Sequence, residues 1–272
     1  MSSLHFLYKT AVGRILLKPL ICPAVTRLSG AFLDTGFSKC LIKSFVRNNN
    51  INTDEYQLDG IRCFNDFFAR RIKEGFRPVD TAPDALIAPC DGLLTAYGIN
   101  KDTVIPVKQS TYSISSLLED SELAKEFEGG MCLVYRLCVD HYHRYGYVDS
   151  GAKSEGRKLK GVFHTVRPIA LEEYPVFIRN QREYCTITSP VFGKMVQMEV
   201  GAMLVGKIVN DENGVRDVVR GAEKGHFEYG GSTIIVLIRK DAARINEAIL
   251  KASASGEETP VRLGEKVGTA VS

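Results

Sequence analysis

The stretch Lys224–Leu237, KGHFEYGGSTIIVL, holds the glycine pair and the strand around which the rest of this 272-residue chain is interpreted. One interpretation is a β-hairpin, in which Gly230 and Gly231 form a two-residue turn and Thr233 opens the returning strand. The other is that Gly231 leaves its carbonyl uncovered, so that the hydroxyl of Ser232 reaches the preceding peptide bond. Because Gly-Gly turns are common, the stretch alone favours the hairpin.

The part of the chain after residue 88 has the composition of many short strands, rich in β-branched and aromatic residues and bounded by turn-forming residues. Asn213-Gly214 predicts a second hairpin turn, and residues 241–253 predict a helix capped by Asp241. The tail after residue 258 predicts one further β segment. The predicted strands are GLLTAYGI (92–99), MCLVYRLC (131–138), GVFHTV (161–166), EYCTITS (183–189), KMVQMEVG (194–201), AMLVGKIV (202–209), VRDVVR (215–220) and STIIVLI (232–238).

The N-terminal part of the chain has a different residue pattern, one typical of helices. Residues 4–47 predict two or three helices, and residues 63–75 predict another, capped by Asn65 or Asp66 and ended by Gly75. The first 47 residues hold one acid and a series of basic residues, a pattern that fits a helix lying on a bilayer surface or a helix packed on the protein with its cations in solvent. These basic residues are Lys9, Arg14, Lys18, Arg27, Lys39, Lys43 and Arg47.

We therefore predict an α+β fold. An N-terminal helical region, residues 1–80, precedes a mainly antiparallel, β-rich domain, residues 81–272, built as a sandwich or a partly open barrel. No uncharged apolar run reaches eighteen residues, and charges interrupt the N-terminus, so we expect an intracellular protein without a signal peptide. Seven cysteines without CxxC pairs predict reduced thiols and no metal site. No nucleic-acid partner is expected.

Polar residues with catalytic potential interrupt these apolar strands. Asp91 lies in a Pro-Cys-Asp-Gly turn, where an aspartate commonly bonds its own backbone. A packed or surface role is the default for either His141 or His143, but the two are two residues apart, so on a strand both point to one face next to Asp140, which adds some support for acid–base chemistry. Asp91, a histidine and Ser232 have the composition of a charge-relay set, and His164 is a further candidate base.

Seven motifs together resemble one enzyme family, the phosphatidylserine decarboxylases, which are pyruvoyl-dependent proenzymes. The resemblance extends from about Ile61 to Leu237 in the family's order and is nearest to the bacterial branch with a Gly-Gly-Ser-Thr processing site. P-loop, GxGxxG, HExxH and GxSxG motifs are missing from the sequence. The motifs are NDFFARRIKEGFRPVD, APCDG, LCVDHYHRYGYVDSG, HTVRPIA, MEVGAMLVGKI, VVRGAEKG and FEYGGSTIIVL.

The resemblance implies a self-made cofactor. The chain would cleave between Gly231 and Ser232, giving a β chain of residues 1–231 and an α chain of residues 232–272. Ser232 Oγ would attack the Gly231 carbonyl, activated by a base that Asp91 orients, to give an ester. Elimination of that ester would leave dehydroalanine, and hydrolysis of the dehydroalanine would give a pyruvoyl group and ammonia. This group would form a Schiff base with phosphatidylserine, and His143 would reprotonate the α carbon after loss of CO2.

The substrate implied by the resemblance is a membrane lipid. This favours docking of the N-terminal helices on an anionic membrane surface, as a peripheral protein on the cytoplasmic side of the cell membrane. The resemblance also implies a homodimer of cleaved chains. A lipid-directed serine hydrolase is the alternative, and it would keep an intact chain of 30.1 kDa. A lipoyl-like carrier would need a lysine at a hairpin tip, and DENGVRD has none.

One position departs from the family pattern. Many members read Tyr-His-Arg-x-His and use the second histidine in self-cleavage, whereas this chain has Gly146 there. Three explanations are open: His143 serves both steps, His141 or His164 takes the vacated role, or maturation is impaired. We predict that His143 serves in the relay with His164 as its helper.

Overall fold

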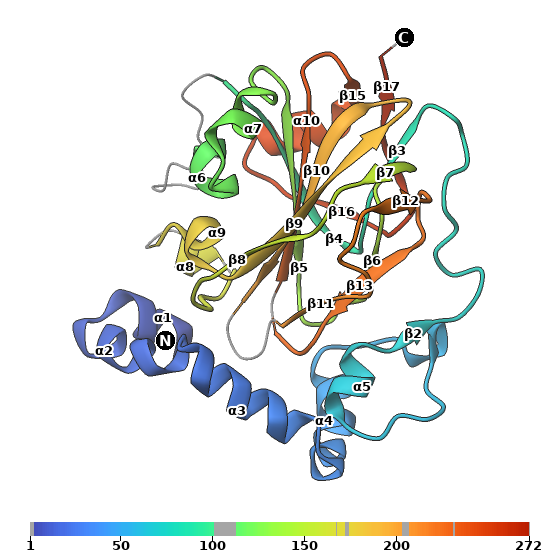
Figure 1. Ribbon diagram of the computed structural model, residues 1–272. Coiled ribbons are helices and arrows are strands. Elements are labelled where there is room, and N and C mark those ends of the chain that lie inside the picture. The colour runs from blue at the N-terminus through green and yellow to red at the C-terminus, as the bar shows by residue number, and fades with distance from the viewer. Residues whose placement is uncertain are drawn as a thin grey trace.

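The computed structural model describes residues 3–100, 113–166, 168–171, 174–202, 207–230 and 232–271. Helices come first and mainly antiparallel strands follow, which confirms the predicted α+β class (Figure 1). The helices are α1 (Ser3–Lys9), α2 (Ala11–Leu20), α3 (Pro23–Leu33), α4 (Cys40–Asn48), α5 (Phe64–Phe68), α6 (Ile114–Leu118), α7 (Ser121–Lys125), α8 (Pro168–Leu171), α9 (Val176–Arg179) and α10 (Glu247–Ala254), with 3-10 turns at Gly36–Lys39 and Thr53–Glu55. The strands are β1 (Tyr56–Gln57), β2 (Arg71–Ile72), β3 (Ala85–Ile87), β4 (Gly92–Gly98), β5 (Met131–Leu137), β6 (Arg144–Gly146), β7 (Gly151–Lys153), β8 (Arg157–Leu159), β9 (Arg182–Ser189), β10 (Gly193–Gly201), β11 (Ile208–Asn210), β12 (Arg216–Val218), β13 (Glu223–Phe227), β14 (Ser232–Ile238), β15 (Ala243–Ile245), β16 (Thr259–Val261) and β17 (Lys266–Ala270).

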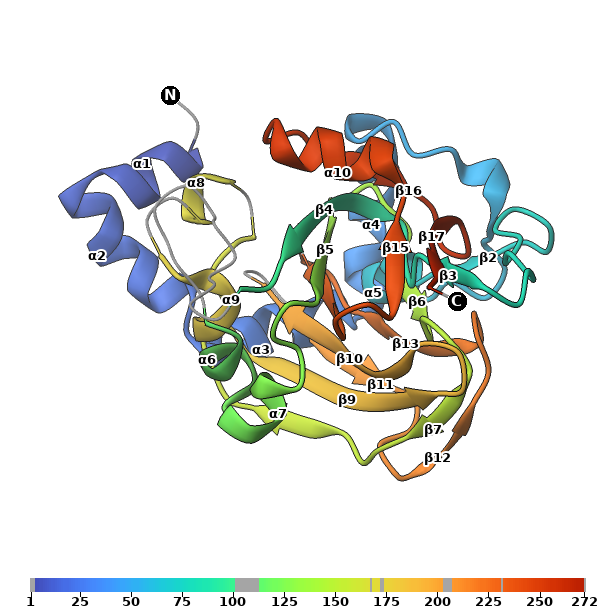
Figure 2. The ribbon, with the colours of Figure 1, turned by 90° about the horizontal axis from the view of Figure 1, so that it is seen from above.

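The strands form one large sheet and three small ones. The large sheet has nine strands in the order β12-β7-β9-β10-β14-β5-β4-β16, with β8 also paired to β9. The small sheets are β11-β13-β6, β15-β17-β3 and β1-β2. Each pairing between named strands in the described ranges is antiparallel, and these strands form open sheets (Figure 2).

Strand β14 lies in the middle of the large sheet, between β10 and β5. Its side chains alternate between two cores: Ile234 and Val236 face one, and Ile235 and Leu237 face the other. The first core is shared with the two three-stranded sheets, and the second with helices α1, α2, α6 and α9. Because both faces of β14 are covered, its sequence from Ile234 to Ile238 is continuously apolar instead of alternating.

Both predicted hairpins are wrong. Strand β13, before the glycine pair, pairs with β11 and β6, whereas β14 pairs with β10 and β5. The chain thus passes from a small sheet to the large one through Gly230, whose φ is 145°, and Gly231 lies outside the described residues. Around Asn213-Gly214, β11 pairs with β13 and β12 pairs with β7. Each turn connects two layers and does not join neighbouring strands.

Two helices are shorter than predicted. Helix α5 begins after Cys63, whose Sγ accepts the Asp66 N–H, and it ends at Phe68 because Arg71 and Ile72 pair with β1. Helix α10 begins only at Glu247, since residues 243–245 form β15 against β17. Asp241 is a turn residue with φ of 56° and caps no helix. The tail forms two strands, β16 and β17, where one was predicted.

The N-terminal helices run along one side of the sheets, with α1 and α2 beside α8 and α9 (Figures 1 and 2). Tyr8 and Leu17 are buried in the core under the large sheet. Among the described residues, no single helix has the length and apolar composition to cross a membrane. Helices α2 and α3, bent by 62°, meet that test only as a pair. The division at residue 80 stays a prediction.

Candidate active site

Ser232 is the first residue of β14, the strand at the centre of the large sheet. It pairs with Gly201 of β10 on one side and Leu137 of β5 on the other. Its side chain is fully buried, and its Oγ has no hydrogen-bond partner among the described residues. An unpartnered buried hydroxyl costs about 1–3 kcal/mol. Such a hydroxyl is available to react with the chain segment that precedes it.

Asp91 lies in the turn before β4 and is held by Arg77. The Arg77 guanidinium donates from Nε and Nη2 to the Asp91 carboxylate at 2.7–3.0 Å, and the Leu263 N–H adds a bond of 2.9 Å. Arg77 also binds Glu55 at 3.0 Å. Sequence reasoning missed Arg77, since it lies fourteen residues before Asp91 in an irregular segment.

Asp91 and Ser232 lie too far apart for direct contact. Strand β5 separates β14 from β4, so the register places Ser232 two strand spacings, about 10 Å, from the start of β4. No hydrogen bond in the described residues joins Asp91 to a histidine. In this uncleaved chain the predicted relay is therefore not assembled as a hydrogen-bonded triad.

His143 is fully buried beside the segment that leads to Ser232. Its ring lies 4.0 Å from that of Phe68, which contacts Tyr229 at 5.1 Å, and its carbonyl accepts the Phe227 N–H. Its Nδ1 lies 2.9 Å from the His141 carbonyl, which makes Nδ1 the protonated nitrogen, and Nε2 has no partner among the described residues. Burial, with help from the Arg70 cation, lowers the pKa of His143 well below 6.5. His143 is thus a neutral imidazole with a free basic nitrogen.

His141 and His143 do not lie on a strand, contrary to the prediction. They belong to the turn between β5 and β6, where the Cys138 N–H donates to His141 Nδ1 at 3.1 Å. His141 lines a cavity of about 430 Å³ with Asp91 and Asp140, and burial lowers the pKa of His141. Cys138, Asp140 and His141 bring possible metal-ligand atoms within 4.8 Å, but the Arg136 guanidinium lies 3.2 Å from Cys138 Sγ and disfavours a cation there.

His164 has different contact partners from His143. Residues 161–166, predicted as a strand, form a loop with one bridge from Val162 to Asn180. The His164 ring stacks on Tyr174 at 4.6 Å, and its Nδ1 lies 3.4 Å from Tyr8 Oη. Burial and then Arg179 lower its pKa to about 4. None of its hydrogen bonds or ring contacts in the described residues involves Asp91, His143 or Ser232.

Gly146, the position without the second histidine, is closely packed by backbone. A Cβ atom there would lie 2.9 Å from the Gly221 carbonyl oxygen and 3.1 Å from that of Ala222. The Gly146 N–H donates a hydrogen bond to the Pro89 carbonyl oxygen, and the Gly146 carbonyl oxygen accepts one from Gln197 Nε2 at 2.9 Å. A histidine does not fit this position unless the neighbouring backbone moves.

The comparisons with known proteins identify the family of the chain. The sequence model described as phosphatidylserine decarboxylase matches residues 64–269. The chain belongs to the phosphatidylserine decarboxylase family. It is 39% identical over 266 residues to a protein named phosphatidylserine decarboxylase proenzyme 2 of Clostridium acetobutylicum, covering 97% of this chain and 91% of that protein. The chain is 40% identical over 270 residues to a protein named phosphatidylserine decarboxylase proenzyme of Clostridium kluyveri, covering 97% of this chain and 91% of that protein. It is 39% identical over 273 residues to a protein of the same name of Ruminiclostridium cellulolyticum, covering 98% of this chain and 91% of that protein.

The phosphatidylserine decarboxylase match contains every predicted site residue, Asp91, His143, His164 and Ser232. Helices α1–α4 precede the matched range, yet the alignments with the clostridial proenzymes cover nearly the whole chain. The similarity to these relatives therefore includes the sequence of the N-terminal helices.

Proposed function

We propose that the protein decarboxylates phosphatidylserine to phosphatidylethanolamine and CO2 with a pyruvoyl group made from Ser232. The observation that carries this proposal is the buried Ser232 hydroxyl at the start of β14, which has no hydrogen-bond partner among the described residues, in a chain of this family. Relatives named as proenzymes support a chain that is processed before it acts. Cleavage would separate residues 1–231 from residues 232–272.

The chain's own groups are suited to make this cofactor. Ser232 Oγ attacks the Gly231 carbonyl carbon while its proton passes to a base, and the peptide nitrogen leaves, which converts the amide to an ester. A base then removes the Ser232 α-proton, the ester carboxylate departs, and hydrolysis of the dehydroalanine releases ammonia and leaves pyruvoyl. A covalent pyruvoyl group supplies an electron sink for decarboxylation.

His143 is the base and acid that the geometry favours. Its unprotonated Nε2 lacks a partner in the described residues, so it accepts a proton without first losing one. Because its pKa is lowered, the imidazolium formed gives that proton back readily, as reprotonation of the substrate α carbon requires. The contacts of His164 with Tyr8 and Tyr174 favour His143 over His164 for this step. Replacement of each histidine by alanine separates these roles: we expect His143→Ala to stop the two-band pattern on a denaturing gel and His164→Ala to retain it.

Membrane docking through residues 1–80 is part of this proposal. Large apolar side chains are exposed along α2, α3 and the turn after them, among them Ile15, Leu28 and Phe37, which are 66%, 72% and 85% exposed. Basic residues of the same helices would meet anionic head groups. We also propose a peripheral location on the cytoplasmic side of the cell membrane and a homodimer of cleaved chains. Cosedimentation with anionic and zwitterionic vesicles tests the docking, since binding to both alike would exclude the electrostatic contribution.

Release of CO2 tests the reaction. Phosphatidylserine labelled at the carboxylate should yield labelled CO2 and phosphatidylethanolamine with the wild-type chain, and neither with Ser232→Ala. A lipid-directed serine hydrolase would instead release lysolipid or head group with the carboxylate retained. That outcome would replace the decarboxylase proposal with the hydrolase.

A further inference from the structure

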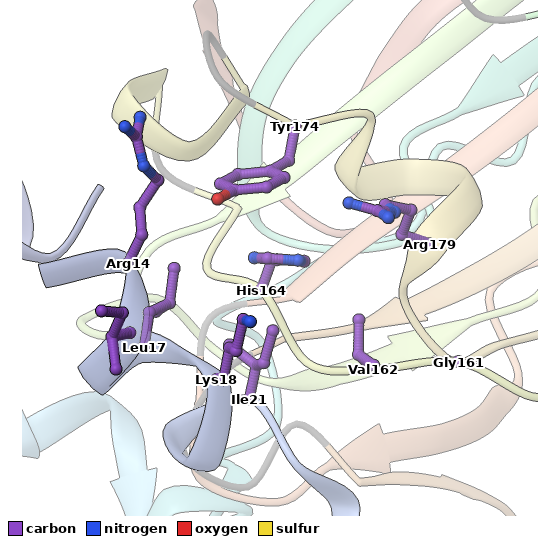
Figure 3. Close-up of a pocket in the computed structure, with 10 residues that line it drawn as sticks. Arg14, Leu17, Lys18, Ile21, Gly161, Val162, His164, Tyr174 and Arg179 are labelled. Carbon is purple, nitrogen blue, oxygen red and sulfur yellow. The ribbon is translucent and has the colours of Figure 1, made fainter. Parts of the chain in front are cut away.

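A cavity of about 580 Å³ lies where α2 packs against the loops around His164 and α9 (Figure 3). Arg14 and Lys18 enter it from α2, and Arg179 enters it from the end of α9. Tyr174 and His164 lie between these cations in the close-up. None of the described residues that line the cavity is acidic. Lys18 and Arg179 therefore bring two cations from distant parts of the chain to one hollow, which suits an anion.

The remaining lining makes the cavity amphipathic. Leu17, Ile21 and Val162 supply an apolar wall beside the cations. His164 is stacked on Tyr174 and adds a neutral polar edge, because its pKa of about 4 leaves it uncharged near neutral pH. An inorganic anion would use only the charged part of such a cavity. A phosphodiester that carries a glycerol and acyl chains would use both parts.

The cavity is joined to the start of β14 by one buried side chain. Asn180 Nδ2 donates to the His164 carbonyl at 2.8 Å and to the Gly201 carbonyl at 2.7 Å, so these two oxygens lie within about 5.5 Å of each other. Gly201 is the strand partner of Ser232. On its other side, the cavity adjoins the exposed Ile15 of α2, which belongs to the proposed docking surface. The cavity thus lies between the docking helices and the reactive serine.

We propose that this cavity binds the phosphodiester of a glycerophospholipid as the lipid passes from the membrane surface to Ser232. Lys18 and Arg179 would hold the phosphate, and the apolar wall would receive the glycerol and the upper acyl chains. This site rests on the proposed function for the identity of its substrate. It adds a phosphate subsite built by α2 and α9 together.

The test is a binding measurement on the Ser232→Ala chain, which stays whole as in the structure. Calorimetric titration with dihexanoyl phosphatidylserine below its micelle concentration should give binding, and dihexanoyl phosphatidylglycerol should bind comparably because it carries the same phosphodiester. We expect Lys18→Gln and Arg179→Gln each to weaken both lipids about tenfold, from the loss of one charge-assisted contact. Lys43→Gln, which removes an exposed charge from α4 outside the cavity, is the matched control and should change neither affinity.

Three outcomes would overturn the subsite. Unchanged affinity in both glutamine variants would exclude it, and so would equal losses in the Lys43 control, which would point to net charge alone. Inorganic phosphate that binds as tightly as the lipids would make the ligand a free anion. Because the titration needs no cleavage, its failure leaves the decarboxylase proposal standing, and a wild-type chain that releases no CO2 leaves the binding result standing.

Discussion

The buried Glu199–Lys224 pair gives the sharpest prediction about what stabilises this fold. Both side chains are buried between the large sheet and the β11-β13-β6 sheet, and Lys224 Nζ lies 2.5 Å from Glu199 Oε2. Asn210 binds both groups, at 3.0 and 3.3 Å, while Glu199 Oε1 has no partner among the described residues. Burial raises the pKa of Glu199, and Lys224 opposes that rise. A charge here is tolerable only while its partner is present.

Removal of one partner should therefore cost more than removal of both. We expect Glu199→Leu to lower the free energy of unfolding by about 3–5 kcal/mol, because it leaves the Lys224 ammonium buried with Asn210 as its remaining partner. The double variant Glu199→Leu/Lys224→Met should return to within about 1 kcal/mol of the parent or exceed it. At about 2 °C per kcal/mol, the melting temperature should fall by about 6–10 °C in the single variant only.

The assay is thermal unfolding in the Ser232→Ala background, so that every sample is one uncleaved chain. Conservative replacement of the exposed pair Glu247–Lys251 on α10 is the control and should shift the melting temperature very little. A double variant as unstable as Glu199→Leu would refute the reasoning, because it would show that the pair contributes net stability and not mutual neutralisation.

Three further predictions concern the site. Gly146→Ala should lower the free energy of unfolding by about 1–3 kcal/mol, because a Cβ atom there meets carbonyl oxygens at 2.9 and 3.1 Å. Gly146→His should impair folding and slow self-cleavage for the same reason, and faster cleavage in this variant, timed on denaturing gels, would contradict this. Arg77→Gln should slow self-cleavage roughly tenfold, because the Asp91 carboxylate is no longer held in place, and Arg77→Lys should restore part of the rate. If Arg77→Gln cleaves at the wild-type rate, the orientation of Asp91 by Arg77 does not matter for cleavage. The pKa values of His143 and His164 are lower in the folded chain than in the unfolded chain, so on acidification the unfolded chain takes up protons at a higher pH than the folded chain does. The free energy of unfolding should therefore fall as the pH drops below about 6.5, by about 1.4 kcal/mol per pH unit for each histidine. Denaturant unfolding between pH 7 and 5 checks this, and a stability that rises on acidification would exclude neutral buried histidines.

The sequence predicts the class and the central strand because both depend on composition. The run from Ile234 to Ile238 is apolar at every position, as a strand covered on both faces must be. The hairpins fail for a different reason. Gly-Gly and Asn-Gly report a local turn, whereas the partners of β13 and β14 are decided by the layer that each strand joins.

The roles of Asp91, His143 and Ser232 are predictions from their motifs, and the arrangement of these residues could not be predicted. Spacing in the sequence gives no sign that Arg77 holds Asp91 or that Phe68 packs on His143. The restriction at Gly146 comes from backbone at residues 221 and 222, far away in the chain. Such contacts between distant segments leave no periodic pattern in a single sequence.

The intact mass of the purified wild-type chain tests the central claim most directly. The account predicts two fragments, residues 1–231 and 232–272, with the smaller one blocked to N-terminal sequencing and reactive toward hydroxylamine, and a single chain for Ser232→Ala. A wild-type protein that stays one unreactive chain of 30.1 kDa would contradict it.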